Sequence, residues 1–66
     1  MQIIVNGKEQ TIERADTIDE LLLELGFERL SVAVALDGTF VARGEYATTK
    51  LKEKMDTEVL VPMQGG

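Results

Sequence analysis

A capped amphipathic helix constrains the fold of this chain more than any other sequence feature. Thr17-Ile18-Asp19-Glu20 has the form of a capping box, in which the threonine oxygen accepts a backbone N–H three residues on and the glutamate reaches back. Apolar residues then share one face at spacings of three and four: Ile18, Leu21, Leu22 and Leu25. Gly26 can end the helix in a left-handed conformation. We therefore predict one helix over residues 18–25, with a single apolar face.

Two hairpin signals flank this helix. Asn6-Gly7 and Asp37-Gly38 tolerate positive φ at both turn positions, which favours two-residue hairpins. The segments beside them, and one near the end of the chain, are rich in β-branched or alternating apolar residues, as strands are. The predicted strands are Met1–Val5, Lys8–Glu13, Val32–Leu36, Thr39–Arg43 and Glu58–Pro62.

Two connections are predicted around the second hairpin. Phe27–Ser31 is a loop that leads from the helix into this hairpin. Gly44–Met55 is longer and mostly polar, so we predict a helical turn in it, with Tyr46 and Leu51 anchored in the core.

The order of elements, ββαββ, predicts an α+β fold. A strand that follows a helical crossover can pair in parallel with an earlier strand. Placing the last strand parallel to the first, with the helix on one face, gives a mixed sheet of the ubiquitin-like β-grasp type. We expect one domain over residues 1–66, with residues 63–66 a flexible tail. The predicted core consists of Met1, Ile3, Val5, Ile12, Ile18, Leu21, Leu22, Leu25, Val34, Leu36, Leu51, Val59 and Val61.

Composition narrows the functional classes. The chain has no cysteine and no histidine, which excludes disulfides and thiolate or imidazole metal sites and removes the commonest nucleophile and general base. We therefore expect no catalytic residue, no metal site and no enzymatic activity. The net charge of −5 argues against nucleic acid and anionic membranes, and it permits a partner with a basic face.

Cellular location is also predicted from the sequence. No apolar run approaches the length of a membrane span, and Met1 leads into a predicted strand rather than a signal peptide. The absence of cysteine is typical of a reducing compartment. We therefore expect the protein to be cytoplasmic.

The last residues carry the most distinctive chemistry. After the apolar strand residues Val59–Val61 comes Pro62, which lacks a backbone N–H, and then Met63, Gln64 and Gly65-Gly66. Glycines without Cβ atoms can pass through a narrow channel, and they leave the Gly66 carboxyl carbon open to attack. We predict that the folded domain presents this carboxylate to a partner. The alternative is that these glycines are merely a frayed end.

A partner surface is predicted on the face of the sheet that the helix leaves open. By alternation Ile4 and Leu60 point to that face, and Ala33 and Ala35 lie beside them. These four residues form a modest apolar patch of the kind that docks a protein. The alternative is that they are ordinary isolated apolar residues on a surface.

Five segments, in their order and spacing, carry a family resemblance: Met1–Lys8, Thr17–Leu22, Val32–Gly38, Phe40–Arg43 and Gly65-Gly66. On these segments the chain resembles the ThiS family, the sulfur carrier proteins of bacterial thiamin biosynthesis, over essentially its whole length. The departures from the family pattern are at two turns, Leu36-Asp37-Gly38 and Met55-Asp56, so they do not touch the tail.

The resemblance implies a carrier cycle centred on Gly66. A ThiF-like adenylyltransferase would use ATP and Mg²⁺ to convert the Gly66 carboxylate into an acyl-adenylate. A sulfur donor enzyme would then replace AMP and leave a thiocarboxylate, which a ThiG-like thiazole synthase would consume. The chain would thus be a protein cosubstrate that binds no cofactor itself. Gly65, Gln64 and Met63 would pass through the channel of the partner.

Other functions share this fold and tail. A molybdopterin synthase small subunit is the nearest, although such chains tend to be longer. A carrier for another sulfur pathway, such as cysteine synthesis or tRNA thiolation, also fits. Two further classes stay open: a ubiquitin-like modifier joined to lysines, and a non-catalytic interaction module whose tail is inert.

Overall fold

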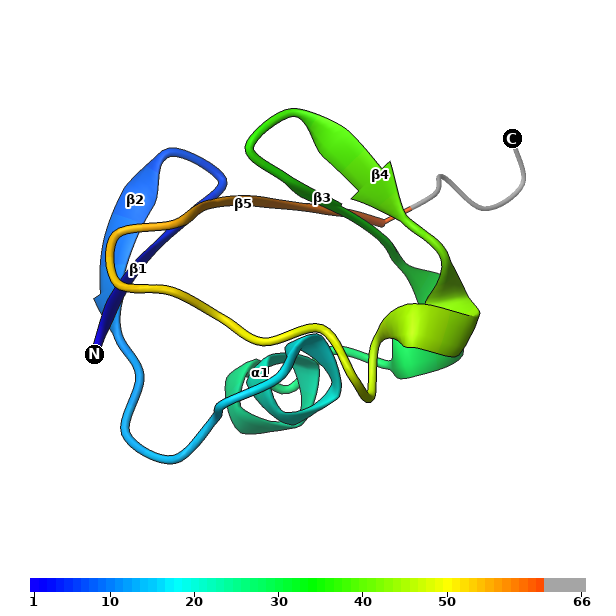
Figure 1. The fold of residues 1–66 in the computed structure, drawn as a ribbon, viewed down its shortest axis with the longest axis horizontal. Coiled ribbons are helices and arrows are strands. Elements are labelled where there is room, and N and C mark those ends of the chain that lie inside the picture. Colours follow the sequence, from blue (N-terminus) through cyan, green and yellow to red (C-terminus); the bar gives the residue numbers. More distant parts are fainter. Residues whose placement is uncertain (62–66) are drawn as a thin grey trace.

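The computed structural model describes residues 1–61, which form one five-stranded sheet covered on one side by a helix (Figure 1). Its elements are β1 (Gln2–Val5), β2 (Lys8–Thr11), α1 (Ile18–Leu25), η1 (Arg29–Ser31), β3 (Ala33–Leu36), β4 (Thr39–Val41), η2 (Arg43–Glu45) and β5 (Asp56–Leu60), where η marks a 3₁₀ turn. The prediction of a tail at residues 63–66 lies outside the described residues.

The sheet has the mixed topology that the order of elements predicted. Its strand order is β2-β1-β5-β3-β4, with β1 parallel to β5 and the other neighbours antiparallel. The last strand therefore lies in the middle of the sheet. Figure 1 shows α1, together with the long connection from η2 to β5, on one side of the sheet. This arrangement confirms the α+β β-grasp fold with one main helix on one face.

Both hairpins turn at the predicted dipeptides. Asn6 and Gly7 have φ values of 51° and 83°, and Asp37 and Gly38 have φ values of 50° and 85°. Positive φ at both positions is the requirement of a type I′ turn, whose twist matches that of the flanking strands. The predicted strand ends were less accurate. Each of the first four strands is shorter than predicted, and β5 begins and ends two residues earlier than predicted.

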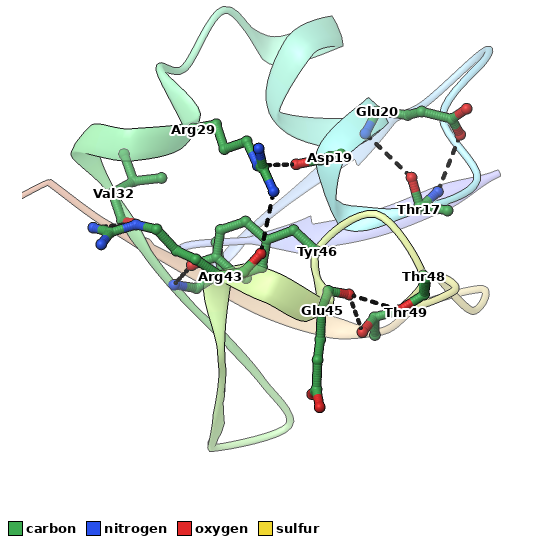
Figure 2. A network of polar contacts seen from close by, with 11 residues as sticks. Thr17, Asp19, Glu20, Arg29, Val32, Arg43, Glu45, Tyr46, Thr48 and Thr49 are labelled. Atoms are coloured by element: carbon green, nitrogen blue, oxygen red, sulfur yellow. Dashed lines mark hydrogen bonds and ion pairs between the residues drawn. The ribbon is translucent and has the colours of Figure 1, made fainter.

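Helix α1 begins and ends as its sequence predicted. The Thr17 hydroxyl oxygen accepts the N–H of Glu20 at 3.3 Å, and the Glu20 carboxylate accepts the N–H of Thr17 at 3.2 Å (Figure 2). At the other end Gly26 has a φ of 85°, and the Phe27 N–H donates to the Leu22 carbonyl at 2.9 Å. These bonds satisfy backbone groups that a helix leaves without internal partners.

The core lies between α1 and the sheet. Nine of the thirteen predicted core residues are buried, and Leu25 and Leu36 are partly buried and pack against this cluster. Two predictions were wrong: Met1 is 40% exposed and Val61 is 60% exposed. Met1 precedes β1 and Val61 follows β5, so neither is held over the helix by strand pairing on both sides.

The connection after β4 ties the helix to the sheet. Tyr46 is 1% exposed, and its hydroxyl oxygen accepts the buried N–H of Val34 at 3.1 Å. The Tyr46 carbonyl in turn accepts the N–H of Asp19 in the first turn of α1 at 3.0 Å. Figure 2 shows Arg29 reaching Asp19, with 2.8 Å between Nε and Oδ1, and the carbonyl of Arg43. The burial of Tyr46 and its own hydrogen bonds confirm its predicted anchoring role.

Glu24, near the end of α1, holds the segment that leads from β2 to the helix. Its carboxylate accepts three backbone N–H groups, from Glu13 at 2.8 Å, Arg14 at 3.1 Å and Ala15 at 2.9 Å. These bonds, chiefly the one from Glu13, lower the pKa of Glu24 below its usual value.

Replacing Glu24 by glutamine should lower the stability of the domain at neutral pH, and this deficit should shrink in acid. The stabilisation by ionised Glu24 is complete above the pKa of the unfolded chain, about 4.3, and disappears as the pH falls through the lowered pKa of the folded protein. Urea midpoints of wild type and Glu24→Gln at pH 7 and pH 3 measure this effect. Glu28→Gln, which changes the same charge just beyond the helix, is the control. An equal deficit at both pH values would contradict this role of the carboxylate.

Candidate functional site

The predicted reactive residues, Met63, Gln64, Gly65 and Gly66, lie outside the described residues. The structure does show the strand that leads to them. β5 runs through the middle of the sheet and is paired with β1 on one side and β3 on the other. It ends at Leu60, and Val61 beyond it is largely exposed. The chain therefore approaches Pro62 from the central strand of the sheet.

An apolar patch lies on the open face beside the end of β5. Leu60 pairs with Ala33 of β3, and on the other side of β3 Phe40 pairs with Ala35. Residues directly opposite one another share a face, so Leu60 and Phe40 flank the alanines of β3. Leu60 is 46% exposed, Phe40 is 66% exposed and Ala33 is half-buried. We define the open-face patch as Ala33, Phe40 and Leu60.

All four predicted patch residues lie on the open face, but Ala35 and Ile4 do not extend the exposed apolar surface around Leu60. Ala35 points to the open face but is only 2% exposed, because the larger side chains of Phe40 and Glu58 stand opposite it on both sides. Ile4 is half-buried and pairs with Asp56, at the far end of β5 from Leu60. Four residues of a strand span about 13 Å, so Ile4 is not continuous with the open-face patch.

Phe40 was missed as a surface residue. Either Phe40 or Val41 was expected to anchor the strand Thr39–Arg43. The signal was nevertheless present, because a two-residue turn at Asp37-Gly38 requires Phe40 to pair with Ala35. Since Ala35 was already assigned to the open face, Phe40 had to share it. Val41 is the residue of β4 that packs against the core.

Acidic side chains border the open-face patch. Alternation along β5 buries Thr57 and Val59 and exposes Asp56, Glu58 and Leu60 on the opposite face. Glu58 therefore lies on the open face next to Ala35, and the whole chain carries a net charge of −5. A docking partner that combines apolar and basic side chains would match this surface, with the charges chiefly speeding the encounter.

Within residues 1–61, no group of three or more acidic side chains is placed to hold a metal ion. Two shallow hollows lie on either side of Leu23 on α1, away from β5; Glu20 and Leu23 line both. No helix in residues 1–61 has the length and apolar character needed to cross a membrane.

Comparisons of the sequence and of the structure with known proteins point to the same family. A sequence model described as the ThiS family matches residues 3–66. A thiazole synthase from Magnetococcus marinus is 36% identical over 66 residues, which is all of this chain and 20% of that protein. The chain thus spans about a fifth of the length of this curated relative.

Solved structures agree with the sequence match. The crystal structure of the thiamine biosynthesis protein ThiS from Geobacter metallireducens superposes with a TM-score of 0.84 and 33% identity, and the match covers all of both chains. A solution structure of a thiamine biosynthesis protein from the same organism gives a TM-score of 0.81 at 33% identity, covering all of this chain and 88% of that one.

Proposed function

This chain belongs to the ThiS family, and on that basis we propose that it carries sulfur for thiamin biosynthesis as a thiocarboxylate on Gly66. The observation that carries the proposal is the family match itself, which extends over the folded domain and through Gly65-Gly66. The structure supports it by placing the strand that leads to these residues in the centre of the sheet, beside an apolar surface open to a partner.

The proposed cycle begins with activation of Gly66. One carboxylate oxygen attacks the α-phosphorus of ATP, the bond between the α-phosphorus and the bridging oxygen breaks, and pyrophosphate leaves with Mg²⁺. A carboxylate is a poor electrophile, whereas the acyl-adenylate carries AMP as a good leaving group. A ThiF-like adenylyltransferase supplies the nucleotide site and the metal.

Sulfur transfer then replaces the adenylate. Hydrosulfide supplied by a sulfur donor enzyme attacks the Gly66 carbonyl carbon, the carbon–oxygen bond to AMP breaks, and the products are a thiocarboxylate, AMP and a proton. Gly66 is therefore a substrate position, and the chain is a cosubstrate that is restored to a carboxylate in each cycle. Gly65, Gln64 and Met63 serve to bring it into the partner's channel, where residues without bulk at the end are an advantage.

A thiazole synthase is the proposed sulfur acceptor. The Magnetococcus marinus protein named thiazole synthase contains a region similar to all of this chain. A region of this kind within a thiazole synthase supports a functional link between the two, with a ThiG-like protein as the partner that removes the sulfur.

The first docking step is proposed to use the open-face patch together with Glu58. Ala33, Phe40 and Leu60 supply the apolar contact, and the acidic border favours a partner with basic side chains. Ile4, next to Asp56, is a second apolar residue that a large partner could reach at the other end of β5.

Pyrophosphate release tests the first step. A ThiF-like adenylyltransferase incubated with Mg²⁺ and ATP should release pyrophosphate only when this chain is added. The rate should saturate as the concentration of the chain rises, because the carboxylate is a substrate. No release, from an adenylyltransferase that is active on another carrier of the family, would contradict adenylation of this chain.

A further inference from the structure

The two sides of β5 are paired to different extents. On the β3 side four residue pairs run from Leu36 and Thr57 to Ala33 and Leu60, the last residue of the strand. On the β1 side pairing stops after Thr57, because the chain leaves β1 and turns at Asn6-Gly7. The N–H of Asn6 donates to the Thr57 carbonyl at 2.8 Å, which is the last backbone bond on this side. The N–H and C=O of Val59 point to the same side of β5 as the Thr57 carbonyl, but β1 has already ended at this position.

The side chain of Asn6 supplies the missing partner. Its Oδ1 accepts the N–H of Val59 at 2.8 Å, and its Nδ2 donates to the carbonyl of Val59 at 3.2 Å. A carboxamide offers one donor and one acceptor side by side, as a peptide group does. The Asn6 side chain therefore continues the hydrogen bonding on the β1 side of β5 as far as Val59. Val59 lies two residues before the exposed Val61.

The second hairpin makes a corresponding contact at the other end of β5. Asp37 has nearly the same φ as Asn6, 50° against 51°, and its Oδ1 accepts the N–H of Asp56 at 3.3 Å. The N–H of Asp37 also donates to the Asp56 carbonyl at 2.8 Å. The first residue of each turn thus binds β5, Asp37 at its beginning and Asn6 close to its end.

We propose that Asn6 is a positioning residue for the reaction of the C-terminus, because its carboxamide holds β5 at Val59 and so fixes the point from which the chain leaves the sheet. The inference rests on the proposed function of Gly66. A carboxylate that must meet the α-phosphorus of ATP in a partner's site depends on how firmly the last strand is held, since reaction rates fall steeply with misplacement. Asp37, at the far end of β5, has no such role.

The test compares Asn6→Gly with Asp37→Gly. Glycine adopts positive φ without strain, so both variants can keep their turns while they lose the side-chain bonds to β5, and both gain the same freedom in the unfolded chain. Loss of two hydrogen bonds should speed hydrogen exchange at the Val59 amide in Asn6→Gly by about tenfold. The maximal rate of pyrophosphate release should fall by about fivefold in Asn6→Gly, with the half-saturating concentration of carrier nearly unchanged. Asp37→Gly should retain both Val59 protection and the maximal rate.

The outcomes separate this inference from the proposed function. Equal maximal rates in wild type, Asn6→Gly and Asp37→Gly would overturn the positioning role, as would unchanged exchange at Val59. Equal losses of rate in the two glycine variants would also overturn it, because they would indicate a general effect on stability. If wild type itself releases no pyrophosphate, the proposed function fails, and exchange at Val59 alone then decides whether Asn6 holds the strand.

Discussion

A chain that ends at Gln64 should fold normally, bind the adenylyltransferase and support no release of pyrophosphate. The sheet, the helix caps and the core all lie within residues 1–61, so removing Gly65 and Gly66 leaves them intact. The carboxylate, however, moves back by two residues, which is about 7 Å of extended chain. An activated complex tolerates errors far smaller than this, so the rate should fall below detection. The shortened chain should instead inhibit the wild type competitively, because its docking surface is unchanged.

A stability control makes the result of this truncation decisive. A urea midpoint equal to that of wild type shows that the fold is retained. Full activity of the chain that ends at Gln64 would refute the role of Gly66, and failure to inhibit wild type would show that the folded domain does not dock by itself.

Replacing Leu60 by aspartate should weaken binding to the adenylyltransferase by about tenfold to a hundredfold, the range expected for a central apolar contact. The new carboxylate would lie in the apolar contact area, two residues from Glu58 on the same face of β5. Because Leu60 is already 46% exposed, the fold should tolerate the change. Phe40→Asp should act in the same direction. Titration of the adenylyltransferase with each variant, by calorimetry or fluorescence, measures the affinity.

Leu30→Asp is the matched control for Leu60→Asp. Leu30 is 75% exposed and lies in η1, outside the sheet, so the same change of residue and charge occurs away from the open-face patch. Its affinity for the adenylyltransferase should match that of wild type. Equal binding by a well-folded Leu60→Asp variant would disprove docking at the open-face patch. Equal weakening by Leu30→Asp would point to the net charge of the chain instead of a local contact.

Features decided by neighbouring residues were predictable from the sequence. The bounds of α1 follow from the capping box at Thr17 and from Gly26, because each forms bonds within one turn of the helix. Asn6-Gly7 and Asp37-Gly38 are turns for an equally local reason, since both positions of each have positive φ. Once these elements were known, the parallel pairing of the first and last strands was the natural way to close the sheet.

Features decided by contacts between distant residues were not predictable in the same way. The position of β5 depends on its register with β1 and β3, which places Asp56 next to Ile4 and ends the strand at Leu60. That register separates Ile4 from Leu60 and divides the predicted apolar patch. The bonds from Asn6 to Val59 join residues 53 positions apart, so no local pattern could indicate them. The proposed chemistry of Gly66 depends on the family match, because residues 1–61 carry no part of the reactive end.

Intact mass spectrometry tests the central claim most directly. The full chain is incubated with ATP, Mg²⁺, the ThiF-like adenylyltransferase and a sulfide source, and its mass is compared with that of an incubation without ATP. Replacement of one carboxylate oxygen by sulfur should add about 16 mass units, and fragmentation should place the gain on Gly66. The chain that ends at Gln64 should show no gain. An unchanged mass of the full chain, in an incubation where pyrophosphate is released and sulfide is in excess, would contradict the proposal that Gly66 carries the sulfur.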